Sequence, residues 1–219
     1  MTQQFILTSS GREHALNGHD VYELDNAPSI KEIANSLAQI NRFTGHASRP
    51  YSVAEHSLLV AQIAKRMGLP PIGQLAALMH DACECITNDL SSPSKEVIGN
   101  VWHEFEAGHQ GTLLERYRLG GAYRQYRAII KHADLIALAT ERRDLMPFDP
   151  AKNRPWPIID TPGAEVEPDV TQLNTLAREL TGWHAWKTCF IERFVELSEL
   201  ALPATEESSV AEGTESGVA

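Results

Sequence analysis

Apolar residues recur at helical intervals along most of this chain, between short polar or Gly/Pro-rich segments. The clearest stripe has apolar residues three, four or seven positions apart: Val53, Val60, Ile63 and Met67. Ser52 and Glu55, at its start, have the spacing of a capping box, and Gly68 follows its end. Because these are the usual start and stop signals of a helix, the pattern predicts a helix over 52–67.

The same reasoning predicts helices along most of the remaining sequence. Their ranges in chain order are 29–41, 71–83, 95–108, 111–119, 122–145, 170–180 and 186–197. Residues 1–27 show little periodicity and are predicted to form a loop with at most one short strand. Residues 147–168 are rich in proline, which favours an extended surface loop.

This pattern favours an all-α fold. A chain of 219 residues with 42% hydrophobic residues suits one sizeable core, so we expect a single domain over 1–202 with a helical core region at 28–145. Residues 203–219 are mostly acidic or small, with almost nothing to bury, and are expected to be a disordered tail.

The formal net charge of −10 argues against a nucleic-acid groove or an anionic membrane surface as a partner. It does not argue against a nucleotide, because one basic side chain and a metal ion neutralise a phosphate locally. Three unpaired cysteines suit a reducing compartment, and no apolar run approaches the length of a membrane span. We therefore expect a soluble cytoplasmic protein.

Four candidate metal ligands fall near the interior face or the end of three predicted helices: His56, the adjacent pair His80 and Asp81, and Asp134. Two imidazoles and two carboxylates suit a divalent ion with open positions better than a closed structural zinc cage. Taken singly, a buried histidine is more often a core residue, and Asp134 could pair with Lys131 or Arg127. Their joint order favours the metal site.

Other polar residues lie near these four. Glu84 follows His80 by four residues, so if the helix continues both share one face, where a carboxylate could orient or protonate a reacting group. A solvent-facing glutamate is the alternative. Asp89 could contact substrate or cap the next segment. Arg42, followed by Phe43, could hold a phosphate beside an apolar wall, or simply favour the helix dipole.

The motifs carrying these residues resemble a known family. They are Ile40-Asn41-Arg42-Phe43, Val53-Ala54-Glu55-His56-Ser57, His80-Asp81-x-x-Glu84, Asn88-Asp89-Leu90-x-x-Pro93-x-Lys95 and Lys131-x-Ala133-Asp134. Over residues 28–140 the chain resembles the HD-domain metal-dependent phosphohydrolases. It is similar to the bacterial 5'-deoxynucleotidases and to the compact phage-type deoxynucleotide phosphohydrolases, including those that cleave dATP.

The resemblance implies an HD-domain helical bundle and a role for each matching residue. It implies four ligands of a divalent metal (Co, Mn, Ni, Fe, Mg or Zn): His56, His80, Asp81 and Asp134. Glu84 would activate or protonate, and Asp89 would act near the sugar. Arg42, Phe43 and Lys95 would contact substrate, with Phe43 standing where the deoxynucleotidase branch has the tryptophan that crowds the ribose 2' position.

The function expected from this resemblance is removal of phosphate from deoxynucleoside monophosphates, as a 5'-deoxynucleotidase. A triphosphohydrolase that releases tripolyphosphate from dNTPs is the alternative within the enzyme class. A non-catalytic, nucleotide-binding HD protein is a third hypothesis. The expected partners are a small deoxynucleotide and further copies of the same chain, with no nucleic-acid polymer and no membrane.

Overall fold

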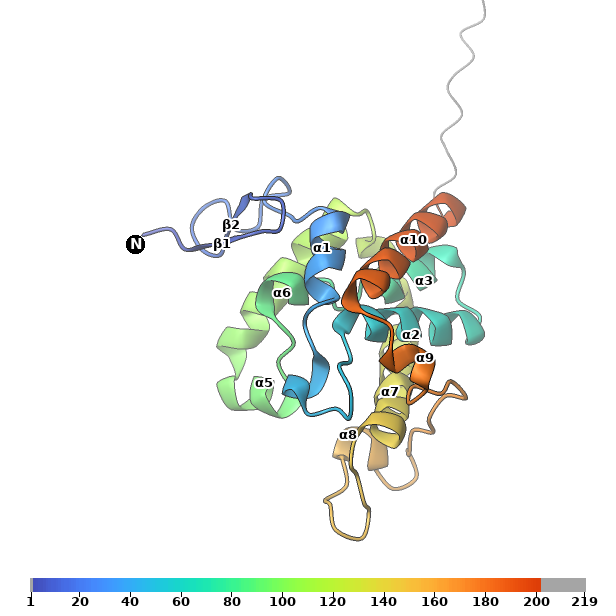
Figure 1. Ribbon diagram of the computed structural model, residues 1–219. Helices are drawn as coiled ribbons and strands as arrows, with labels where there is room; N and C mark the ends of the chain where they lie inside the picture. Colours follow the sequence, from blue (N-terminus) through green and yellow to red (C-terminus); the bar gives the residue numbers. More distant parts are fainter. Residues whose placement is uncertain (1, 202–219) are drawn as a thin grey trace, which may run out of the picture.

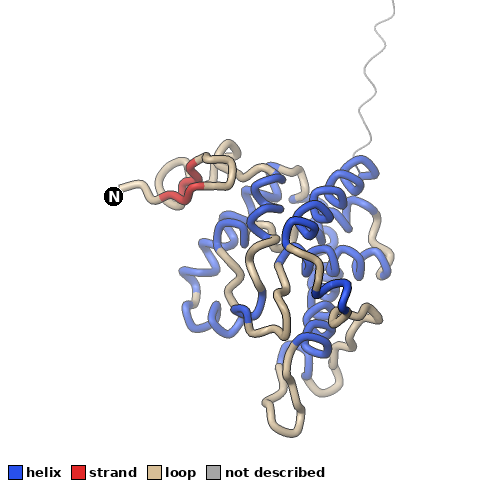
Figure 2. Tube along the Cα trace, in the orientation of Figure 1, coloured by secondary structure: helices blue, strands red, loops and turns tan. Residues whose placement is uncertain are grey.

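The computed structural model describes residues 2–201, so the disordered tail expected at 203–219 lies outside the described residues. Helices dominate the fold, and one small sheet lies beside them near the N-terminus (Figures 1 and 2). This sheet pairs β1 (Phe5–Leu7) with β2 (Glu13–Ala15) in antiparallel register. The mainly helical class predicted from the sequence is confirmed. The hairpin was not predicted, because the sequence indicated at most one short strand in this region.

The helices in chain order are α1 (Ile30–Leu37), the 3-10 turn η1 (Arg42–Gly45), α2 (Val53–Arg66), α3 (Pro71–Leu78), α4 (Glu84–Thr87), α5 (Ser92–Ile98), α6 (Asn100–Arg116), α7 (Gly120–Leu145), α8 (Pro157–Asp160), α9 (Leu176–Glu179) and α10 (Trp183–Ala201). The predicted helices at 52–67, 122–145 and 186–197 are therefore confirmed to within a few residues.

Helix α2 lies at the centre of the helical body and packs against α3, α7 and α10 (Figure 1). It begins as predicted, because the Ser52 hydroxyl accepts a hydrogen bond from the backbone N–H of Glu55 at 3.2 Å. Apolar side chains on all its faces are buried, with Val53 and Val60 fully so. Fully burying such a side chain stabilises the fold by about 1.5–3 kcal/mol. The position of α2, and of every residue on it, is therefore well fixed.

Helix α1 is shorter than predicted. It ends at Leu37, and the chain then runs beside the start of α2, where the Ile40 carbonyl accepts the Val53 N–H at 3.0 Å and Asn41 pairs with Ser52. This pairing with the start of α2 takes the place of the last predicted turn of α1. As a result, Arg42 lies in η1 rather than at a helix end.

Helix α3 also ends early, at Leu78 rather than at Cys83. Residues 79–83 form successive turns before α4 begins at Glu84. His80 and Asp81 therefore lie on irregular backbone between two helices, and Glu84 does not continue the helix that leads to His80.

The predicted break between helices 95–108 and 111–119 is wrong. The break is at Gly99, whose φ of +77° favours glycine, and α6 runs through Gly108. A Cβ atom on Gly108 would lie 2.4 Å from the Tyr22 ring. Gly108 is therefore a contact point, where the segment that follows the hairpin packs on the helix.

The helix predicted at 170–180 is also wrong, since only the short α9 forms there. Leu173 alone of the predicted stripe is buried, while Leu180 is 75% exposed. The backbone at Leu173 bonds to side chains of other elements, with its carbonyl accepting from Arg49 and its N–H donating to Asp144. Tertiary hydrogen bonds have taken the place of helical ones.

The extended loop predicted at 147–168 is present, with only the single turn α8 inside it. It lies beside the end of α7 (Figure 1). Within residues 2–201, every helix is too short or too polar to span a lipid bilayer.

Candidate metal centre

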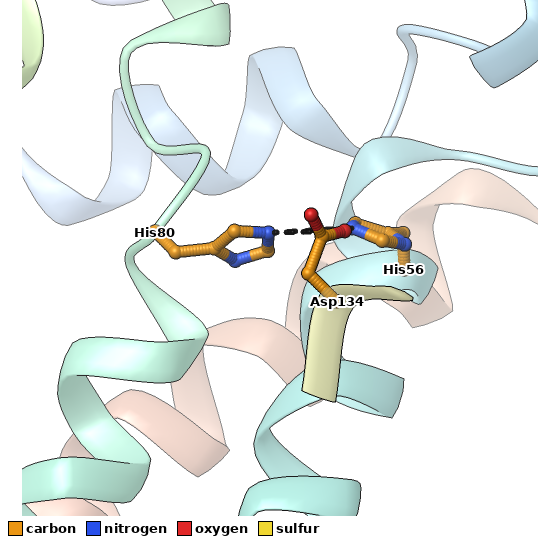
Figure 3. Close-up of side chains that lie close together, drawn as sticks. All are labelled: His56, His80 and Asp134. Carbon is orange, nitrogen blue, oxygen red and sulfur yellow. Dashed lines mark hydrogen bonds and ion pairs between the residues drawn. The ribbon is translucent and has the colours of Figure 1, made fainter. Parts of the chain in front are cut away.

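Three of the four predicted ligands meet at one point: His56 from α2, His80 from the turn after α3, and Asp134 from α7 (Figure 3). One ligand atom of each lies within 4.8 Å of the others. The two Nε2 atoms are 3.4 Å apart, and Asp134 Oδ1 is 3.3 Å from His56 Nε2 and 3.8 Å from His80 Nε2. This group could hold a metal ion.

The outer nitrogen of each imidazole has an acceptor beside it. His56 Nδ1 lies 2.5 Å from Glu141 Oε1, and His80 Nδ1 lies 2.8 Å from the Ala77 carbonyl oxygen. Each Nδ1 therefore carries the proton in the neutral ring, which leaves the Nε2 lone pairs facing each other and Asp134. Such hydrogen bonds orient histidine ligands in metal proteins.

Asp81, the fourth predicted ligand, lies at the same place. Its Oδ2 is 3.1 Å from His80 Nε2 and 3.4 Å from His56 Nε2. The Asp81 and Asp134 side chains are 25% and 19% exposed, whereas the His56 side chain is fully buried. The group is thus open to solvent on the side of its carboxylates. Asp134 also accepts from Lys131 at 2.9 Å, so the pairing considered as an alternative exists beside the contacts to histidine.

The charges favour a cation at the centre. Burial opposes protonation of His80, yet the Asp81 and Asp134 carboxylates outweigh it and raise the pKa of His80 to about 9. Burial and Arg42 likewise oppose protonation of His56, but Glu141, Asp134 and Asp81 raise its pKa well above the usual range. The carboxylates stabilise positive charge at the two Nε2 atoms, whether a proton or a metal ion supplies it.

A divalent ion fits this donor set. Two imidazole nitrogens and two carboxylate oxygens converge, and all four are acceptors once the histidines are neutral. Four acceptors in van der Waals contact repel one another unless a cation lies between them. Mixed N/O ligands of this kind suit Mn²⁺, Fe²⁺, Co²⁺, Ni²⁺ or Zn²⁺, and the solvent-facing side leaves room for further ligands.

Glu141 is a residue of the centre that the sequence analysis missed. Its side chain is fully buried on α7 and contacts the Tyr51 hydroxyl at 2.9 Å and Arg42 Nη2 at 3.3 Å, besides His56. Burial alone would raise the pKa of Glu141, but Arg42 and His56 lower it, so the group is anionic. The available signal was its spacing, since Glu141 follows Asp134 by two helical turns and shares its face.

Arg42 lies between the carboxylates of the centre. Its guanidinium is 3.7 Å from Asp81 and 4.0 Å from Asp89, and its side chain is only 11% exposed. Burial would lower the pKa of Arg42, but Glu141, Asp89 and Asp81 raise it well above the usual range. Arg42 is therefore a fixed positive charge beside the candidate ligands, and Asp89 is one of its partners rather than a cap of α5.

Glu84 is buried at the start of α4, so the solvent-facing alternative is wrong. Its Oε1 lies 3.8 Å from Lys95 Nζ, and its buried Oε2 has no hydrogen-bond partner among residues 2–201. Burial, together with Asp81 and Asp89, raises the pKa of Glu84 well above the usual range, which suits a proton donor. Lys95 also pairs with Glu106 at 2.5 Å, a contact that the sequence analysis did not anticipate.

Phe43 is the remaining residue that was predicted to contact substrate. It follows Arg42 in η1, and the Arg42 guanidinium carbon lies 5.6 Å from the centre of its ring. The backbone at Phe43 has a φ of +56°, and Thr44 a φ of +53°. Such values are uncommon outside glycine, so this turn is strained.

Comparison with known proteins gives relatives across most of the chain, and no protein-family model matches it. The chain is 36% identical over 198 residues to the uncharacterized protein YfdR of Escherichia coli K12, an overlap of 90% of this chain and 97% of YfdR. The chain belongs to the YfdR family. An uncharacterized protein of Rhodobacter capsulatus is 32% identical over 161 residues, or 67% of this chain and 82% of that protein.

Membership of the YfdR family carries no activity with it, because the names of both relatives state none. The match to YfdR includes most of the chain, so it extends beyond the region 28–140 in which the candidate residues lie. Any assignment of chemistry to this YfdR-family protein therefore depends on the site itself.

Proposed function

We propose that this protein is an HD-domain, metal-dependent phosphohydrolase that removes phosphate from 2'-deoxynucleoside monophosphates. The observation that carries the proposal is the group of facing acceptors at His56, His80, Asp81 and Asp134, with the cation Arg42 buried beside it. An open divalent site next to a fixed arginine combines the two features that phosphoryl transfer requires, charge neutralisation and positioning.

The residues take distinct roles in this proposal. His56, His80, Asp81 and Asp134 would hold a divalent ion, which would supply an activated water and neutralise charge on the phosphate. Arg42 binds a second phosphate oxygen, which its fork of N–H groups suits. Glu84, whose pKa is raised by burial, passes a proton to the leaving oxygen of the sugar. Asp89, which lies 4.0 Å from Arg42, would accept a hydrogen bond from the sugar.

A triphosphohydrolase acting on dNTPs is the second candidate, and one observation favours it. Three exposed basic side chains, Arg124, Arg127 and Lys131, are spaced three and four residues apart on α7 and so share one face. Lys131 contacts Asp134, which brings this basic face to the edge of the candidate metal centre. A chain of three phosphates carries enough charge to use these side chains, whereas a monophosphate reaches fewer of them.

Product analysis separates these two enzymes. Purified protein would be incubated with each dNMP, each dNTP and the matching ribonucleotides in Mn²⁺, Co²⁺ or Mg²⁺. The proposal expects inorganic phosphate from dAMP and its analogues. Tripolyphosphate from dATP would instead establish the second candidate. The ribonucleotide arm tests whether Phe43 crowds the 2' position as the tryptophan of the resembling enzymes does.

A nucleotide-binding protein without activity is the remaining hypothesis. Protein that stays inert with every nucleotide and metal, yet binds one nucleotide, would overturn hydrolysis in favour of it. The buried Glu84 argues against this outcome, because binding alone gives no reason to keep a carboxyl oxygen, Oε2, without a hydrogen-bond partner among residues 2–201 beside the candidate metal site.

We also propose that the protein forms a homo-oligomer. Exposed apolar side chains on α10, such as Leu200, support this proposal, and light scattering tests it.

A further inference from the structure

The proline-rich segment 147–168 brings aromatic rings next to the candidate centre. Trp156 lies beside Phe43, with 6.3 Å between ring centres and 35° between ring planes. Phe148 lies on Trp156 edge to face at 6.1 Å. The sequence separates Phe43 from Trp156 by more than a hundred residues, so the fold alone brings these rings together, at the end of α7 where α8 lies (Figure 1).

Trp156 is held firmly in place. The guanidinium carbon of Arg142 on α7 lies 4.5 Å from the Phe148 ring centre and 5.3 Å from that of Trp156. Arg142 also pairs with Asp160, which in turn accepts the Trp156 backbone N–H at 2.6 Å. Arg142 is next in sequence to Glu141, the partner of His56. One stretch of α7 therefore positions both the metal ligands and the aromatic rings.

The rings are within reach of a bound nucleotide. The Phe43 ring centre is 5.6 Å from the Arg42 guanidinium carbon and 6.3 Å from the Trp156 ring centre, so Trp156 lies no more than about 12 Å from that cation. This span is of the order of the length of a nucleoside monophosphate. Phe43 and Trp156 are both half-buried, which leaves part of each ring available for contact.

The strained backbone supports a role in binding. Phe43 and Thr44 adopt left-handed conformations that their side chains disfavour, and such strain persists only where surrounding contacts impose it. Phe43 contacts both Arg42 and Trp156, and it also packs against the apolar core. The turn thus places an aromatic ring beside both the proposed phosphate-binding cation and the loop.

We propose that Trp156, together with Phe43, forms the platform on which the base of the nucleotide stacks. The inference rests on the proposed function for its ligand, and it assigns specificity to the loop 147–168. Stacking tolerates every base because each has a π face, and it favours purines for their larger area. Loss of one stacking aromatic side chain weakens binding roughly 10- to 100-fold.

A structural role for Trp156 is the rival explanation, and ligand-observed NMR separates the two. Saturation-transfer difference spectra of dAMP would be recorded with the metal-free protein in EDTA, which prevents turnover. We expect the base protons H2 and H8 to receive more saturation than the sugar protons. In Trp156→Leu, which keeps an apolar side chain, that excess should vanish and dAMP affinity should fall at least 10-fold, while Trp156→Phe retains part of it.

Trp183→Leu is the matched control, because Trp183 lies on α10 and stacks on His184. It should keep the wild-type pattern of saturation. Thermal unfolding of each variant shows whether the fold is intact. An unchanged base signal in folded Trp156→Leu overturns the platform.

The outcomes also separate this inference from the proposed function. Phosphate release from dAMP with no effect of Trp156 on base contacts overturns the platform and leaves hydrolysis standing. Base contacts that depend on Trp156, without turnover in any metal, keep the platform and overturn hydrolysis. Absence of any saturation transfer to dAMP at millimolar concentration overturns the platform, and with no turnover it overturns both.

Discussion

The two sides of the candidate centre are built in different ways. On the ligand side, His56 and Asp134 project from the regular helices α2 and α7, whose buried faces pack against each other. On the side that we propose binds substrate, hereafter the substrate side, Arg42 and Phe43 lie in a strained 3-10 turn, and Trp156 lies in a proline-rich loop. The other two candidate ligands, His80 and Asp81, lie in the turn after α3, so the ligand side is helical only in part.

The two sides also differ in the contacts that fix the positions of their side chains. Helix packing fixes His56 and Asp134 through many apolar contacts in a close-packed core. The turn and the loop depend on a few polar contacts, such as that between Arg142 and Asp160. Substitutions on the two sides should therefore differ in kind, with loss of metal on one side and loss of rate or ligand affinity on the other.

The largest effect is expected from Asp81→Ala on the ligand side. Removing one of two carboxylates that face both imidazoles should abolish bound metal and turnover together. Metal content by plasma mass spectrometry and phosphate release from dAMP measure the two losses. Asp20→Ala, on an exposed aspartate, is the control. Normal metal content in Asp81→Ala would remove this residue from the ligand set.

Glu84→Ala should separate the two sides most clearly. Because Glu84 is assigned to the proton and not to the metal, the variant should keep its metal and lose turnover by roughly 10²- to 10⁴-fold. Glu104→Ala, exposed on α6, should retain both. Unchanged turnover in Glu84→Ala would end its assignment as the proton donor, and lost metal would move it to the ligand side.

Glu141→Gln tests the contact that joins the sides, since Glu141 bonds both His56 and Arg42. The neutral amide should orient His56 less firmly, and we expect metal affinity to fall roughly 10- to 100-fold. Competition with a fluorescent chelator measures that affinity. Glu192→Gln, exposed on α10, serves for comparison. Wild-type affinity in Glu141→Gln would show that the negative charge of Glu141 is not needed to orient His56 for the metal.

The smallest effect concerns strain in the turn. Thr44→Gly relieves a left-handed conformation, which should raise the free energy of unfolding by about 1 kcal/mol. Glycine also increases the conformational entropy of the unfolded chain, and this offsets part of that gain. Thr140→Gly, at a buried position near the end of α7, should lower the free energy of unfolding. Urea unfolding measures both. Equal destabilisation by the two changes would show that the turn stores no strain.

The sequence predicted the helical side of the centre better than the substrate side, for a physical reason. The stripe around His56 and the one around Asp134 reflect burial on helices, and burial imposes a period that can be recognised in the sequence. Glu141 lay on that same period, yet a charged residue gives no sign that it is buried until its partners are known. Its partner Arg42 is 99 residues away along the chain.

The substrate side, at Arg42, Phe43 and Trp156, has no comparable periodicity. In the segment after the loop the pattern was misleading, because Leu176 and Leu180 matched a helical stripe but are exposed. The backbone nearby is held by Arg49 and Asp144 instead. Trp156 had no predicted role, since nothing in a proline-rich segment indicates where it folds back. Contacts made through a loop depend on anchors that are distant in sequence, and no local pattern records them.

Those anchors determine which part of the loop can change in length and composition. The loop is fixed near its end by Asp160 on Arg142, and the chain after it by Asp169 on Arg66 and by Leu173 on Arg49. Residues between Phe148 and Trp156 are mostly exposed and lie outside these attachments. Changes in the length and composition of that interval should therefore alter the surface of the loop and leave in place the helices that carry His56 and Asp134.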